Sequence, residues 1–70
     1  MSYDEFVAKV WELVYQCPEH WRTGQKVFNV LDYNFGLARE VQFEDGIDCF
    51  YDDELVQEFI DKCWVRYNAN

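Results

Sequence analysis

The chain has 70 residues, half of them hydrophobic, and a formal net charge of -8 that arises from 14 acidic and 6 basic residues. A chain of this length forms one domain, residues 1–70, and its negative charge disfavours direct binding to nucleic acid or to an anionic membrane. No stretch reaches the roughly 18 apolar residues that a membrane span needs, and the start of the chain does not resemble a signal peptide. These features predict a small cytoplasmic protein.

Aromatic side chains and cysteines bear on how so short a chain is stabilised. Aromatic residues make up 20% of the sequence, and each can bury on the order of 150 to 250 Å². We therefore expect a core that needs no disulfide. The chain has three cysteines, Cys17, Cys49 and Cys63, and no two of them have CxxC spacing. An odd number of cysteines without such a motif favours reduced thiols inside a cell.

The first predicted helix covers residues 3–17. Ser2 followed by Glu5 has the spacing of a capping box, and Pro18 lacks the N–H that would continue the helix. Apolar residues recur along it at helical spacing, which predicts a buried arc. The arc contains Tyr3, Phe6, Val7, Val10, Trp11, Leu13, Val14 and Cys17.

The second predicted helix, residues 23–35, is expected to lie at the centre of the fold. Thr23 is the predicted N-cap, and Gly36 is the predicted left-handed residue that ends the helix. One face of the helix is mostly apolar and is expected to form the floor of the core. It contains Val27, Val30, Leu31, Asn34 and Phe35, with Phe28 at its edge.

Residues 39–51 lose the helical period. Residues 39–43 and 47–51 each alternate polar and apolar side chains, and Gly46 stands where a three-residue hairpin loop needs a positive φ. We predict a short β-hairpin that packs Val41, Phe43, Ile47 and Cys49 on the helices, with Tyr51 as a further candidate. A helical turn at residues 37–41 followed by an ordered loop is the competing interpretation.

The third predicted helix covers residues 53–67, and its apolar arc contains Leu55, Val56, Phe59, Ile60, Cys63, Trp64 and Tyr67. Asp52 or Asp53 is expected to cap it, and Lys62 and Arg66 near its end suit the helix dipole. The predicted fold is therefore mainly α, with three amphipathic helices and a short hairpin or ordered loop between the second and the third. It would be a small α+β fold if the hairpin is counted.

Motifs for metal binding and catalysis are incomplete. When Gly46 is aligned with the invariant glycine of an EF-hand loop, Val41 falls at the first ligand position. His20 and the scattered cysteines supply no four-ligand zinc set, and His20 lies on a different predicted corner from Cys49. We therefore predict no metal, no cofactor and no catalytic residue, that is, a protein that is not an enzyme.

A polar motif combines the start of the second helix with the segment before the third. Because an arginine can form a forked contact with a carboxylate, we predict that Arg22 bridges to Asp48 or Asp52 and locks this segment to the helix. The alternative is a module in which Arg22 and nearby aromatic residues hold a small anion or a nucleotide. The predicted structural motif contains Arg22, Gln25, Asn29, Asp48 and Asp52.

The same motif carries a family resemblance. The runs Trp21-Arg22-Thr23-Gly24-Gln25, Phe28-Asn29-Val30-Leu31 and Asp48-Cys49-Phe50-Tyr51-Asp52 resemble the pattern W-R-x-G-Q-x-x-F-N-x-L followed by D-x-F-Y. This pattern recurs in short uncharacterised proteins of bacteriophages and related mobile elements, where a proline often stands at the position of Cys49. The resemblance covers about half of the chain, and it implies a phage or bacterial setting and a shared scaffold without an activity to transfer.

Charge is the main indication of function. Residues 44–61 contain eight acidic residues and no lysine or arginine, which favours a basic partner. We predict a small acidic protein that binds a basic protein surface in a bacterial host cell, for example as an inhibitor of a nucleic-acid-handling protein. A structural virion component and an acidic face that only maintains solubility are the alternatives. The predicted contact residues are Glu44, Asp45, Asp53, Glu54, Glu58, Asp61, Tyr51 and Trp64.

Overall fold

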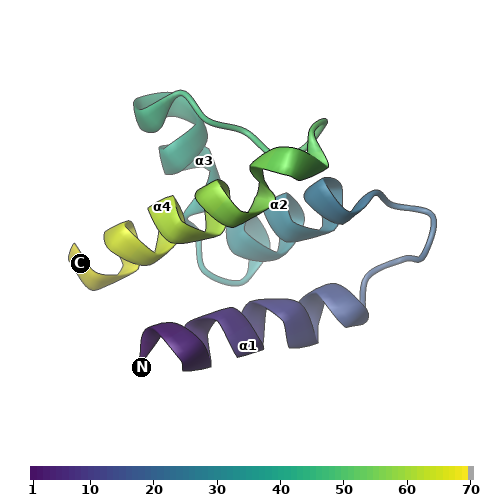
Figure 1. Ribbon diagram of the computed structural model, residues 1–70, viewed down its shortest axis with the longest axis horizontal. Helices are drawn as coiled ribbons and strands as arrows, with labels where there is room; N and C mark the ends of the chain where they lie inside the picture. Colours follow the sequence, from purple (N-terminus) through teal and green to yellow (C-terminus); the bar gives the residue numbers. More distant parts are fainter. Residues whose placement is uncertain (70) are drawn as a thin grey trace.

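The computed structural model describes residues 1–69 and is mainly helical, without a β-strand in that range (Figure 1). The prediction of a mainly α fold is therefore confirmed. Within residues 1–69, no helix combines the length and the apolar character that crossing a bilayer requires. The helical segments are α1 (Tyr3–Tyr15), α2 (Thr23–Tyr33), α3 (Ala38–Glu40), the π-helical turn η1 (Val41–Asp45), the 3-10 turn η2 (Asp53–Leu55) and α4 (Val56–Ala69).

Helix α1 begins as the sequence predicts. The Glu5 N–H donates to Ser2 Oγ over 3.2 Å, and the Ser2 N–H donates to the Glu5 carboxylate over 2.9 Å. This backbone donor lowers the pKa of Glu5 below its ordinary value. The helix ends at Tyr15 and not at Cys17, because the final N–H groups turn back to acceptors three residues earlier, just before Pro18.

The core lies between α1, α2 and α4, with α1 running beneath the other two helices in the view of Figure 1. The apolar arcs predicted for the three helices supply most of it, so helical periodicity located the core correctly. Trp11, at the edge of the α1 arc, is exposed. The side chains of the three helices that are completely buried are Phe6, Val10, Val27, Leu31, Phe59, Ile60 and Cys63.

The predicted hairpin at residues 39–51 is wrong. Residues 38–45 form continuous helical turns, and Gly46, with φ of 68°, ends η1 in the left-handed conformation. Leu37, Ala38 and Val41 lie on one face of these turns and are buried, whereas Phe43 falls on the opposite face and is 90% exposed. The competing interpretation, a helical turn at residues 37–41 followed by an ordered loop, is closer to the structure, although the helical turns continue to Asp45.

The ends of the other helices differ by a few residues from the prediction. Helix α2 ends at Tyr33 and not at residue 35, and Gly36 has the expected positive φ of 67°. The predicted helix 53–67 begins as η2 and continues through α4 to Ala69. Asp52 caps it as predicted, since its carboxylate accepts the Glu54 N–H over 3.0 Å.

Candidate interaction surface

The start of α2 meets the connector, residues 48–53, at unusually short range around Gly24. The Gly24 N–H donates to Asp53 Oδ1 over 2.7 Å, and the Cys49 thiol donates to the Gly24 carbonyl oxygen over 3.3 Å. A Cβ atom at residue 24 would lie 1.9 Å from the Cys49 carbonyl oxygen. Only glycine fits this contact without a shift of the backbone.

Asp53 has the capping role that the sequence assigned to Thr23. The N-cap position of α2 is Arg22, whose side chain makes no capping hydrogen bond, and Thr23 is already the first helical residue. The Asp53 carboxylate instead accepts a first-turn N–H of α2 from across the fold and complements the positive end of the helix dipole. The predicted Thr23 cap is therefore wrong. The Asp53 carboxylate, which was predicted to contact a partner, already forms a hydrogen bond within the fold.

Arg22 contacts the connector without forming the predicted ion pair. Its Nη2 donates to the Phe50 carbonyl oxygen over 3.2 Å, and its guanidinium carbon lies 5.3 Å from the centre of the Tyr51 ring. The carboxylate of Asp48 accepts the Phe50 N–H and the Gln42 amide, while that of Asp52 accepts a backbone N–H. Both carboxylates accept local donors, and Arg22 joins the start of α2 to the connector through a carbonyl group.

The remaining residues of the polar motif, Gln25 and Asn29, are partly buried on α2. Asn29 lines a cavity of about 430 Å³ between α2 and the end of α1, together with Cys17, Trp21 and Asp32. The charged side chain in its wall is Asp32, which pairs with Arg39 over 3.3 Å. Arg22 is not part of the wall, so this cavity does not bring together the arginine and the aromatic residues that the nucleotide alternative needs.

The cysteines are thiols that differ in burial. Burial raises the pKa of Cys49 and of Cys63 to about 12, so both stay protonated and poorly nucleophilic at neutral pH. Cys17 is partly buried, and His20 is exposed beside Trp21. Within residues 1–69, no three His, Cys, Asp or Glu side chains are grouped to hold a metal ion.

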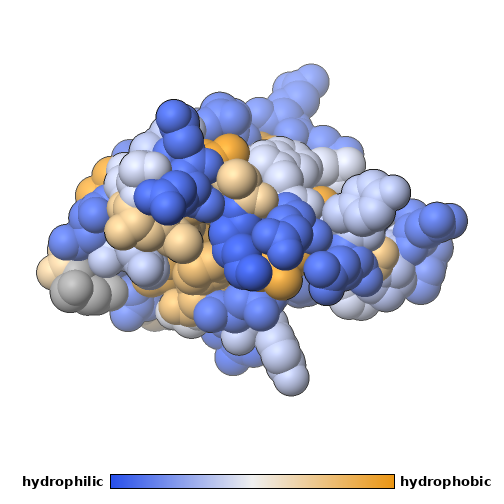
Figure 2. All heavy atoms as spheres, turned by 90° about the horizontal axis from the view of Figure 1, so that it is seen from below, coloured by the Kyte–Doolittle hydropathy of each residue, from blue (hydrophilic) through white to orange (hydrophobic). Residues whose placement is uncertain are grey.

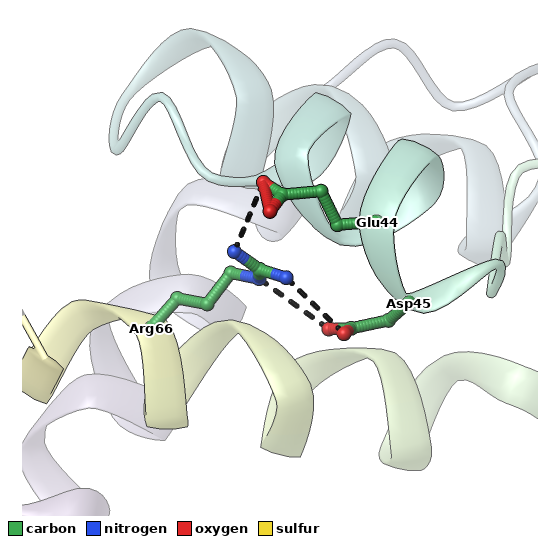
Figure 3. A network of polar contacts seen from close by, with 3 residues as sticks. All are labelled: Glu44, Asp45 and Arg66. Carbon is green, nitrogen blue, oxygen red and sulfur yellow. Dashed lines mark hydrogen bonds and ion pairs between the residues drawn. The ribbon is translucent and has the colours of Figure 1, made fainter.

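Two of the predicted contact acids, Glu44 and Asp45, are bound by Arg66 (Figure 3). Arg66 Nη1 lies 3.3 Å from Glu44 Oε2, and Arg66 Nη2 lies 3.1 Å from Asp45 Oδ1. Arg66 Nε also donates to Asp45, over 3.3 Å. The hydrogen bond to Asp45 raises the pKa of Arg66 above its ordinary value. This cluster neutralises part of the acidic segment internally and ties η1 to α4.

Three other predicted acids, Glu54, Glu58 and Asp61, share the outward face of η2 and α4. Their spacing of four and three residues places them along one side of a helix. All three are exposed, and none forms an ion pair with another described residue of the chain. Asp61 accepts hydrogen bonds from the Tyr3 hydroxyl over 2.6 Å and from Gln57, and the first of these raises the pKa of Tyr3. We call these three residues the α4 acidic face.

The two aromatic residues predicted to support the contact have different surroundings. Tyr51 is 77% exposed. Trp64 is partly buried, with its ring centre 5.3 Å from that of Phe6 and 5.9 Å from that of Tyr3. Trp64 is thus held in the core cluster, whereas Tyr51 is available at the surface.

Phe43 is an exposed aromatic residue that the alternating pattern had placed in the core. The signal that could have located it is the helical spacing of Leu37, Ala38 and Val41, which puts residue 43 on the opposite face. Figure 2 shows the face seen from below in Figure 1, where hydrophobic atoms form a limited area left of the centre of the view and smaller spots elsewhere between hydrophilic side chains.

No protein-family model matches the chain, and no curated protein or solved structure shows significant similarity to it. The resemblance to short phage proteins consequently stays a prediction. Any functional proposal depends on the chemistry of the surface described above.

Proposed function

We propose that the protein is a small acidic, non-enzymatic binding protein that contacts a basic protein surface through the α4 acidic face. The observation that carries this proposal is the difference between the acids. Glu44 and Asp45 are paired with Arg66, and Asp53 caps α2. The carboxylates of the α4 acidic face are exposed, and no described residue of the chain supplies them with a cation.

Charge complementarity explains why the partner should be basic. An exposed row of carboxylates on a chain of net charge -8 attracts a positively charged surface and accelerates its association. Acidic or nucleic-acid partners would meet repulsion at the same face. The phage or mobile-element setting implied by the resemblance fits a bacterial target, such as a nucleic-acid-handling protein whose phosphate-binding groove is basic.

The size of the domain requires more than these three carboxylates. A standard interface buries about 800 Å² on each partner, whereas the whole accessible surface measures 4575 Å². The contact must therefore extend over neighbouring exposed side chains. Val65 on α4 is 64% exposed and Tyr51 before η2 is 77% exposed, so both can contribute apolar area beside the acids.

A charge reversal with a matched control tests the proposal. The double variant Glu54→Lys, Glu58→Lys reverses the α4 acidic face, and Glu12→Lys, Glu19→Lys makes the same change in net charge on α1 and the corner after it. Each variant and the wild type would be used to isolate binding proteins from a bacterial lysate at moderate salt. Circular-dichroism melting would verify that each variant is folded.

We expect the wild type and the α1 control to retain a basic protein that the reversed α4 face loses. Equal loss in both double variants would indicate that total charge matters and that the α4 face has no special role. If both variants keep the wild-type partner, or if the wild type retains no basic protein, the carboxylates have only a role in solubility.

A further inference from the structure

Phe43 combines high exposure with a side chain that has no polar group. It is 90% exposed, and it is the one exposed phenylalanine within residues 1–69. Single exposed apolar residues are common on protein surfaces, so exposure alone does not identify a contact. The structure around Phe43 is what distinguishes it.

The backbone around Phe43 is fixed on both sides. Val41 is completely buried, and the Gln42 amide donates to Asp48 Oδ2 over 2.6 Å. The next two residues, Glu44 and Asp45, are held by Arg66 on α4 (Figure 3). Because a phenyl side chain has only two torsions, little conformational freedom remains to be lost when this ring binds.

The conformation of this segment is also unusual. Residues Val41–Asp45 form a π-helical turn, a rare conformation that occurs frequently at functional sites. The turn is short, and the Arg66 contacts hold it at its C-terminal end. A rare backbone form, held by specific contacts, presents the apolar ring to solvent.

We propose that Phe43 is the apolar anchor of the partner contact and that it inserts into an apolar pocket rimmed by lysine or arginine on a folded protein. This inference rests on the proposed function and names the partner's side of the same contact. Glu40 is exposed next to the turn, and the Glu44 side chain remains 58% exposed despite its pairing with Arg66. Basic side chains around the pocket would meet these carboxylates.

The turn that carries Phe43 is a neighbour of the helix that carries most of the α4 acidic face. Turn η1 packs against α4 (Figure 1), and Glu58 and Asp61 belong to that helix. Phe43 could also contact a second copy of this chain or an anionic membrane. The net charge of -8 disfavours both partners because they are negatively charged. A basic protein is the partner that both the ring and the charges fit.

The probe is the basic protein that the wild type retains from bacterial lysate, identified by mass spectrometry and purified. Its affinity would be measured by calorimetry for the wild type, Phe43→Ser, Tyr33→Ser and Glu54→Lys, Glu58→Lys. Tyr33 is the matched control because it is 91% exposed at the end of α2. We expect Phe43→Ser to weaken binding by at least about 30-fold, the size typical of a hot-spot residue, and Tyr33→Ser by less than about threefold.

The possible outcomes separate this inference from the proposed function. Binding that survives Phe43→Ser but not the double charge reversal overturns the anchor and leaves the acidic face supported. Binding that survives both, or a wild type that retains no basic protein, overturns both proposals. If the wild type is dimeric in light scattering and the Phe43→Ser variant is monomeric, the ring serves self-association, and the anchor proposal is overturned. A large loss of thermal stability in Phe43→Ser would also overturn it, because the ring would then stabilise the fold itself.

Discussion

Arg22 and Arg66 both contact residues of the acidic C-terminal half of the chain, but they bind different chemical groups there. Arg66 places its guanidinium within 3.3 Å of carboxylate oxygens from two residues, and its side chain is only 24% exposed. Arg22 is exposed and reaches one carbonyl oxygen and one aromatic face. The sequence motif favoured Arg22 as the bridge, whereas the fold gives that role to Arg66.

Competition from backbone donors explains the difference. Each carboxylate near Arg22 already accepts a backbone N–H, and such short-range contacts need no long side chain to be ordered. Glu44 and Asp45 stand at the end of η1, where the side chain of Arg66 extends toward them from α4 (Figure 3). Three aspartates of the connector accept a backbone N–H, and two of them do so at the start of a helical segment. These three residues are Asp48, Asp52 and Asp53, of which Asp52 and Asp53 cap helical segments.

The contact at Gly24 should give the largest effect in the Arg22 region. We expect Gly24→Ala to destabilise the protein by several kcal/mol, because its Cβ would lie 1.9 Å from a backbone oxygen and the backbone would have to move. Destabilisation by more than about 3 kcal/mol is typical of such severe mechanisms. The midpoint of urea unfolding would measure it.

Gly46→Ala is the matched control for this substitution. Gly46 has a positive φ, but beyond its two chain neighbours no residue places an atom within 4 Å of the position that an alanine methyl group would take. The cost there is therefore only that of the left-handed conformation, about 1 to 2 kcal/mol. Equal destabilisation by the two substitutions would contradict the close approach of α2 and the connector.

Removal of the Asp53 carboxylate should have the next largest effect. Asp53→Ala leaves the Gly24 N–H without its acceptor, and loss of a helix cap typically costs about 1 to 2 kcal/mol. Asp53→Asn keeps an acceptor oxygen and should recover part of the loss. Thr23→Ala, at the residue that the sequence predicted as the cap, should change the unfolding free energy by less than about 0.5 kcal/mol. A larger effect at Thr23 than at Asp53 would reverse this assignment.

These capping contacts also mark the limit of what the sequence could predict. The Ser2–Glu5 capping box is local, and it was predicted correctly together with the start of α1. The apolar faces of the three long helices were likewise predicted, because their period depends on neighbouring residues alone. The Asp53 cap joins residues that are 29 positions apart, and no local pattern distinguishes it from a Thr23 cap.

The error at residues 39–51 has a different origin. The alternation of Val41 and Phe43 fits a strand only if both side chains point inward, and Gly46 ends a helical turn as readily as it closes a hairpin. Because of the same error, Phe43 was predicted in the core and not at the surface. For the candidate surface, the sequence supplied the acids but not their pairing, since the Arg66 contacts depend on how η1 packs on α4.

Arg66→Met should lower the melting temperature by about 5 to 8 °C, less than Asp53→Ala does. The substitution keeps much of the aliphatic packing and removes the charge that Glu44 and Asp45 share. Without the positive charge of Arg66, the two adjacent carboxylates repel each other. The difference in melting temperature between this variant and the wild type should become smaller at about 1 M salt, where screening acts over about 3 Å.

The more exposed pair of Arg39 and Asp32 offers the control, and Arg39→Met should have no measurable effect on the melting temperature. Equal shifts in the two variants would contradict the special role of Arg66.

Apart from the control variants, Arg22→Ala should have the smallest effect, a loss of about 0.5 kcal/mol, since this is the lower end of what an exposed cation over an aromatic ring contributes. A buried ion pair with the connector would instead cost about 3 to 5 kcal/mol when one partner is removed, so the size of the loss distinguishes the carbonyl contact from the predicted bridge. Arg22→Lys retains the positive charge over Tyr51 and should recover part of the loss. Urea unfolding of both variants would measure this. A cost for Arg22→Ala above that of Arg66→Met would show that Arg22, and not Arg66, is the arginine that fastens the acidic half of the chain to the helices.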